Sequence, residues 1–210
     1  GAFGISSGLE YTPGSFASTE EISELCKVMK NRGGIYATHM RNEADTVLEA
    51  ISEAIQIGKA AGVPVNISHL KLQGKANWNK IDQAFALIED ANNNGHRVTF
   101  DRYPYTAFST GLSNLFPLWS RDGGRERFLE RLQNKNDLVE IKKYVLDKVS
   151  SLSNWDAVLI AGVKKESNKQ YEGKTIQQII SQTNEDPFEF TRNLLIDENG
   201  SVPMCGFGMS

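Results

Sequence analysis

Short apolar runs and longer amphipathic segments alternate along the first hundred residues. The runs have β-prone composition, while between them apolar residues recur at helical spacing, as in Ile22, Cys26 and Met29. The runs lie at residues 1–6, 34–39, 63–69 and 97–101. Regular alternation of strand and helix is typical of a parallel sheet, either open or closed into a barrel. The pattern therefore predicts an α/β fold.

Capping residues mark the expected helices. Ser18, with Glu21 three positions later, has the form of a capping box, and Gly33 follows the last apolar position of that segment. Asp45 is expected to cap the second helix, and Gly62 is expected to end it. A third helix is expected to follow the loop at residues 74–78.

The regular alternation stops near residue 112. We expect helices around 128–132, 138–149, 175–180 and 187–195, with a strand at 155–163. This part of the chain is more polar and less repetitive than the first. We therefore assign residues 1–112 to a main domain, 113–200 to a small inserted α+β subdomain, and 201–210 to the return into the main domain.

Two histidines follow matched β-prone runs. His39 ends Tyr36-Ala37-Thr38-His39, and His69 ends the next run, one strand-helix-strand unit later. Parallel strands joined in this way place their carboxyl ends at the same edge of a sheet, where α/β proteins carry their sites. Zinc accepts neutral imidazole nitrogens, so metal ligation is favoured over two merely hydrogen-bonded histidines. Two histidines do not complete a catalytic zinc site, and a third ligand must come from elsewhere.

Two more residues share that edge. Lys71 follows His69 by two positions and could bind an anionic group, although a solvated loop lysine fits equally well. Tyr103 follows the next strand and offers a hydroxyl donor. Aromatic packing is the alternative for this tyrosine and for Tyr105.

Other polar residues near the strand ends have weaker signals. Arg41, Asn42 and Glu43 could orient His39 or cap the following helix. Asp101 is expected to be hydrogen-bonded within the sheet rather than to act as a base. His96 falls at the opposite end of its strand and is interpreted as structural.

Composition excludes several classes of function. Net charge is −3 without a basic block, so neither nucleic acid nor an anionic membrane is an expected partner. The longest apolar runs are too short for a membrane span. No glycine-rich phosphate-binding motif is present. Cys26 and Cys205 have no metal-type spacing; Cys26 is expected to be a buried thiol, and the pair favours a reducing, cytoplasmic location.

Four segments together resemble a known family. They are Gly-Ile-Ser-Ser-Gly-Leu-Glu-Tyr at 4–11, Tyr-Ala-Thr-His-Met-Arg-Asn-Glu at 36–43, Ile-Ser-His-Leu-Lys at 67–71 and Asp-Arg-Tyr-Pro-Tyr-Thr-Ala at 101–107. In this order they are similar to the D-aminoacylases, or N-acyl-D-amino-acid deacylases, of the amidohydrolase superfamily. The resemblance covers residues 1–112 well and the later part weakly.

The resemblance implies a (β/α)8 TIM barrel, of which this chain would supply about strands four to seven. It implies zinc-dependent hydrolysis of the amide of a small-molecule N-acyl-D-amino acid. By resemblance, His39 and His69 are zinc ligands, Lys71 and Tyr103 hold the substrate carboxylate, and the Ser6–Tyr11 loop lines the pocket.

Parts of the family pattern are missing. A His-x-His pair and a metal-binding cysteine would lie upstream, and the catalytic aspartate would lie beyond Ser210. We therefore expect an internal piece that is inactive alone and that forms homo-oligomers through unpaired barrel edges. The alternatives are another amidohydrolase, such as a dihydroorotase-like cyclic amidase or an N-acyl-D-glutamate deacylase, and a non-catalytic barrel scaffold.

Overall fold

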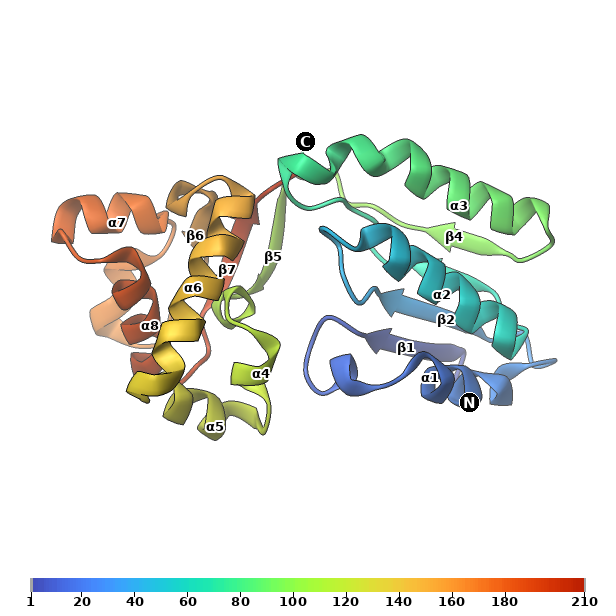
Figure 1. Ribbon diagram of the computed structural model, residues 1–210, viewed down its shortest axis with the longest axis horizontal. Helices are drawn as coiled ribbons and strands as arrows, with labels where there is room; N and C mark the ends of the chain where they lie inside the picture. Colours follow the sequence, from blue (N-terminus) through green and yellow to red (C-terminus); the bar gives the residue numbers. More distant parts are fainter. Residues whose placement is uncertain (1, 210) are drawn as a thin grey trace. The chain divides into compact units, whose positions relative to one another are not determined.

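The computed structural model describes residues 2–209, which form two compact units. The first unit runs to Pro104, and the second begins at Tyr105. Each unit has a sheet and helices of its own (Figure 1). No helix within residues 2–209 combines the length and the apolar character that crossing a bilayer requires.

The first unit contains a four-stranded parallel sheet in the order β1-β2-β3-β4. A helix connects each strand to the next. The elements are β1 (Gly4–Gly8), α1 (Thr19–Cys26), β2 (Ile35–His39), α2 (Val47–Ala61), β3 (Val65–Ile67), α3 (Ile81–Asn93) and β4 (Val98–Phe100), with 3-10 turns at Gly14–Phe16, Lys27–Met29 and Lys75–Lys80. The predicted α/β alternation and the parallel sheet are confirmed. Closure into a barrel stays a prediction.

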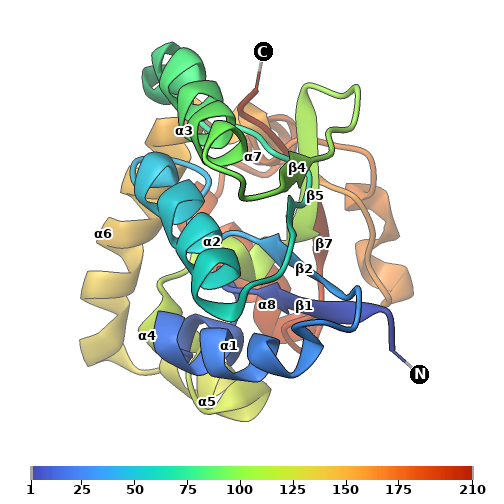
Figure 2. The same cartoon turned by 90° about the vertical axis from the view of Figure 1, so that its right-hand side faces the viewer.

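The three helices cover one face of this sheet (Figure 2). Successive residues of a strand point to opposite faces, so each strand contributes one row to the covered face and one to the open face. Tyr36 and Ile67 lie on the covered face and are fully buried. The other face carries Ser6, Asn66 and Thr99, of which Ser6 and Thr99 are exposed.

The capping predictions are confirmed only in part. The Ser18 hydroxyl accepts a hydrogen bond from the Glu21 N–H at the start of α1, as expected. The cap predicted at Asp45 is wrong, because α2 begins after Thr46. The Asp45 carboxylate instead accepts a hydrogen bond from the side chain of Asn77. The Asp45 side chain therefore contacts the 3-10 turn at Lys75–Lys80 instead of capping α2.

Burial in the first unit agrees with the apolar pattern. Ile51 and Ile57 of α2 are fully buried against the sheet. Cys26 is also fully buried, and burial raises the pKa of its thiol. The expectation that Cys26 is a buried thiol is confirmed.

Gly58 provides a test of how closely α2 packs on β3. A Cβ at this position would lie 2.2 Å from Val65 Cγ2 and 3.1 Å from the Val63 carbonyl oxygen. Gly58→Ala is therefore expected to lower the free energy of unfolding by about 1–3 kcal/mol, because overpacking outweighs the gain in helix propensity. Urea-induced unfolding measures this. Gln56→Ala, on the exposed side of α2, is the control, and equal stability of both variants would contradict the close packing.

The second unit combines a three-stranded antiparallel sheet, in the order β5-β7-β6, with five helices among its described residues. The elements are β5 (Ala107–Gly111), α4 (Leu118–Arg121), α5 (Gly124–Arg131), α6 (Lys135–Leu152), β6 (Val158–Ile160), α7 (Ile176–Thr183), α8 (Pro187–Asp197) and β7 (Pro203–Phe207), with 3-10 turns at Leu112–Leu115, Trp155–Ala157 and Glu166–Tyr171. This part of the chain combines helices with an antiparallel sheet, and the strand expected at 155–163 is shorter.

The position of β5 and β7 differs from the sequence-based division of the chain. β7 is the central strand of the second sheet and pairs with both β5 and β6. Sequence analysis placed these two segments in the main domain, because a β-prone run does not reveal which distant strand it pairs with. The assignment of 113–200 to a lobe inserted in a barrel stays a prediction.

Candidate metal site

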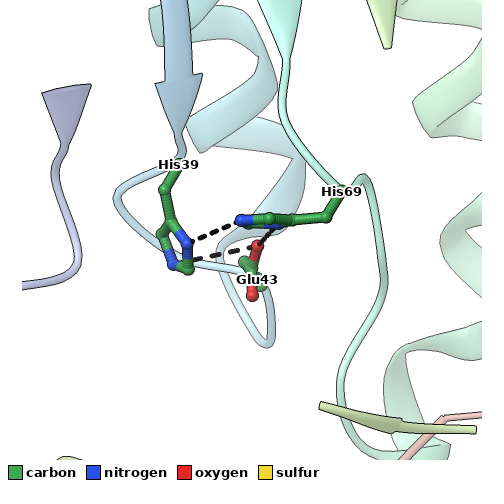
Figure 3. A group of neighbouring side chains, drawn as sticks. All are labelled: His39, Glu43 and His69. Atoms are coloured by element: carbon green, nitrogen blue, oxygen red, sulfur yellow. Dashed lines mark hydrogen bonds and ion pairs between the residues drawn. The ribbon is translucent and has the colours of Figure 1, made fainter. Parts of the chain in front are cut away.

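Two histidines and a glutamate meet at the carboxyl ends of β2 and β3 (Figure 3). His39 is the last residue of β2, and His69 lies two residues beyond β3. Glu43 lies in the loop that leads to α2. One ligand atom from each of the three side chains lies within 4.8 Å of the others. The structure thus brings together the two histidines that sequence spacing had paired.

The two imidazole rings present one nitrogen each to the other. Nδ1 of His39 lies 3.1 Å from Nε2 of His69, and the rings are edge-on, with centroids 4.6 Å apart and planes inclined by 69°. Two nitrogens on one tetrahedral zinc, each bonded at about 2.0–2.1 Å, would be about 3.3 Å apart. The observed separation therefore fits two ligands of a common metal ion.

The other nitrogen of each ring also has charged neighbours. Glu10 Oε2 lies 2.7 Å from Nε2 of His39. Lys71 Nζ lies 2.7 Å and Glu43 Oε1 lies 3.2 Å from Nδ1 of His69. Histidines that bind metal usually donate their second ring N–H to a carboxylate or carbonyl acceptor. The Glu10 carboxylate takes this place behind His39, whereas behind His69 the nearest group is the Lys71 ammonium, which donates to Nδ1, with the Glu43 carboxylate at 3.2 Å.

Glu43 and Lys71 form a buried ion pair. Glu43 is 2% exposed and Lys71 is 5% exposed, and Glu43 Oε1 lies 2.6 Å from Lys71 Nζ. The second carboxylate oxygen accepts a hydrogen bond from the Gln73 side chain. Burial lowers the pKa of Lys71 although the charge and hydrogen bond of Glu43 oppose this. The alternative that Lys71 is a solvated loop lysine is wrong.

Tyr103 lies beside the same cluster. Its ring centroid is 5.6 Å from Lys71 Nζ and 6.3 Å from the His69 ring. Burial, with a further contribution from the charge of Glu43, raises the pKa of Tyr103 to about 12. The hydroxyl consequently stays protonated near neutral pH and can act as a donor.

Ser6 lies farther from the cluster along the sheet. Its register partner is Ala37, two residues before His39, and its side chain is exposed on the open face. Ser6 thus lies on the same face of the sheet as His39, two residues nearer the start of its strand.

Asp101 supports His69 through the backbone. Its Oδ1 accepts the His69 N–H at 2.7 Å, and its Oδ2 accepts a hydrogen bond from the Asn66 amide at 2.8 Å. His69 has a φ of +41°, so a specific contact is needed to hold this unusual conformation. Although partial burial opposes it, these hydrogen bonds lower the pKa of Asp101. The expected hydrogen bonding of Asp101 is confirmed, although the residue lies just beyond β4 and is exposed rather than inside the sheet.

Comparison with known proteins now adds to this geometry. No family model matches the chain. The chain is 46% identical over 112 residues to a D-aminoacylase and 42% identical over 113 residues to an N-acyl-D-aspartate deacylase, both from Alcaligenes xylosoxydans xylosoxydans. The matches cover 53% of this chain and 23% and 22% of the two relatives. The matched part of the chain thus spans less than a quarter of the length of these relatives.

A solved structure is similar over the full length of the chain. It is an N-acyl-D-glutamate deacylase from Bordetella bronchiseptica, complexed with zinc and a phosphonate inhibitor that mimics the tetrahedral intermediate of the reaction. The TM-score is 0.73 at 26% identity, and the match covers 100% of this chain and 35% of that one. The resemblance to the N-acyl-D-amino-acid deacylases is confirmed.

The deacylase resemblance pointed to His39, His69 and Lys71, which the structure places side by side. It included Glu10 in the pocket-lining loop Ser6–Tyr11 but did not predict that its carboxylate contacts His39. The available signal was position, because Glu10 lies two residues beyond β1 and thus at the same edge of the sheet as His39.

Proposed function

We propose that the whole protein is a metal-dependent amidohydrolase of linear amides. It hydrolyses N-acyl-D-amino acids to a carboxylate and a free D-amino acid. The observation that carries this proposal is the facing pair of His39 Nδ1 and His69 Nε2, 3.1 Å apart at the carboxyl edge of a parallel sheet. Similarity to the D-aminoacylases supplies the reaction and the substrate class.

Zinc is the metal that we propose for this site. His39 and His69 would hold it through the two facing nitrogens, since zinc accepts neutral imidazoles. When bound, zinc supplies Lewis-acid polarisation of the acyl carbonyl and a lowered pKa for a bound water. Within residues 2–209, Glu43 is the carboxylate that lies nearest the two histidines as a group, but its Oε1 contacts Nδ1 of His69 and Lys71 Nζ. Other ligands and the general base are expected from further parts of the whole protein.

Lys71 and Tyr103 are proposed to bind the substrate carboxylate. The Tyr103 hydroxyl donates a hydrogen bond, and the Lys71 ammonium contributes positive charge that Glu43 partly balances. Ser6 lies on the open face of the sheet and is proposed to line the approach to the pocket.

The parallel sheet is proposed to be part of a (β/α)8 barrel, since carboxyl-end sites are general in that fold. The inserted lobe at 113–200 would then follow the last of these strands. Cys26 and Cys205 are both free, which agrees with a reducing compartment such as the cytoplasm.

Metal removal tests the proposed function. Dialysis of the whole protein against a chelator is expected to abolish hydrolysis of N-acetyl-D-amino acids, and zinc is expected to restore it, because the activated water depends on the metal. The matched N-acetyl-L-amino acids are the control and should not be hydrolysed. Activity that persists without metal would exclude the proposal, and a protein with no bound metal and no activity would favour a scaffold.

A further inference from the structure

The carboxylate of Glu10 occupies a defined place behind His39. Glu10 Oε2 lies 2.7 Å from Nε2 of His39, on the side of the ring away from His69, and both side chains are only 14% exposed. We propose that Glu10 is a positioning residue that fixes the His39 imidazole with Nδ1 toward the metal. This inference rests on the proposed metal site.

The chemistry of imidazole explains the effect of this contact. A neutral imidazole carries a proton on one nitrogen and a lone pair on the other, and an ionised carboxylate can only accept hydrogen bonds. Glu10 at Nε2 therefore favours the tautomer with Nε2–H. The lone pair then lies on Nδ1, the nitrogen that faces His69 Nε2. A metal ligand needs that lone pair, so the contact prepares His39 for binding.

Glu43 cannot orient His39 through Nε2 in the same way. Its nearest oxygen lies 3.8 Å from Nε2 of His39, which is beyond hydrogen-bond distance, and the same oxygen lies 2.6 Å from Lys71 Nζ. Among the described residues, Glu10 is thus the carboxylate that contacts His39 directly, while Glu43 serves His69 and Lys71.

The pairing of β1 with β2 fixes the position of the backbone before Glu10. Gly8 is the register partner of His39, and the Leu9 N–H donates to the His39 carbonyl oxygen at 3.0 Å. A turn follows, in which the Tyr11 N–H donates to the Gly8 carbonyl oxygen. The Tyr11 ring lies 4.8 Å from the imidazole, so the segment folds over His39.

The segment that follows Glu10 is hydrogen-bonded to the segment that follows β2. Arg41, two residues after His39, donates hydrogen bonds to the carbonyl oxygens of Ser15 and Ala17. Its guanidinium also binds the Glu53 carboxylate of α2 through two nitrogens. These contacts hold the loop in one place, which is what a positioning residue requires.

Three variants of the whole protein test this role. Glu10→Ala is expected to weaken zinc affinity 10–100-fold, the effect typical of losing a partner of a metal-binding histidine. Glu10→Gln keeps an acceptor oxygen and is expected to recover most of that loss. Glu24→Gln changes an exposed carboxylate that contacts Lys27 rather than His39, and its zinc affinity should stay within about threefold of wild type. Competition with a chromophoric chelator measures the zinc dissociation constants.

A second readout does not involve the metal. In the metal-free whole protein, nitrogen-15 spectra of labelled histidine report which ring nitrogen carries the proton. The wild type is expected to show Nε2–H for His39, and Glu10→Ala is expected to lose this preference.

The outcomes separate this inference from the proposed function. If folded Glu10→Ala binds zinc like wild type, or if Glu10→Gln binds as weakly as Glu10→Ala, the positioning role is overturned while the metal site stands. If the wild-type protein itself binds no zinc, the proposed function fails. In that case the spectra alone decide whether Glu10 sets the tautomer.

Discussion

Replacing either His39 or His69 with alanine is expected to remove both zinc and activity from the whole protein. In the proposed site, each residue contributes one of the two nitrogens, 3.1 Å apart, that would hold the ion. Metal catalysis contributes several kcal/mol of transition-state stabilisation. Since about 1.4 kcal/mol corresponds to a factor of ten, kcat/KM for N-acetyl-D-amino acids should fall about a thousandfold or more.

The remaining histidine is a matched control for this experiment. His96 lies between α3 and β4, before the start of its strand and therefore at the other edge of the sheet, and it is exposed. His96→Ala should keep both zinc content and kcat/KM near wild type. Zinc is measured by elemental analysis after gel filtration, and circular dichroism checks the fold. Full activity in a zinc-free His39→Ala variant would show that the metal is not catalytic.

The first sheet could be predicted because its signals are local. Each strand is a short β-prone run, and each connection is one helix long, which leaves little choice but a parallel arrangement. The second sheet could not be predicted in the same way. Its central strand β7 pairs with β5, nearly a hundred residues earlier, and no local pattern specifies that partner.

The site, like the fold, could be predicted only where its signals are local. His39 and His69 could be paired because both follow strands in matched contexts. Glu10 and Glu43 could not be assigned to particular ring nitrogens, because those contacts depend on how two loops fold back over the sheet edge. Loop conformation of this kind depends on tertiary contacts such as those of Arg41, which a spacing rule does not contain.

Glu43→Gln in the whole protein is expected to be strongly destabilising. It removes the partner of a Lys71 ammonium that is almost fully buried. Breaking one member of a buried ion pair costs about 3–5 kcal/mol, because the other charge is left without compensation. Urea-induced unfolding in the presence of a chelator measures the change without a contribution from bound metal. Glu24→Gln, at the exposed pair with Lys27, is the control and should change stability little.

A double replacement distinguishes the cost of an unpaired charge from the loss of packing. Lys71→Met combined with Glu43→Gln removes both charges while keeping similar volumes, so the double variant should be more stable than Glu43→Gln alone. If the double variant instead loses the sum of the two single effects, the pair is not coupled, and the 2.6 Å contact contributes nothing specific. Lys71→Met should also raise KM for N-acetyl-D-amino acids if the ammonium binds the substrate carboxylate. The free energy of unfolding thus reports on the ion pair of Lys71, which forms without substrate. KM reports on the proposed contact between Lys71 and the substrate carboxylate.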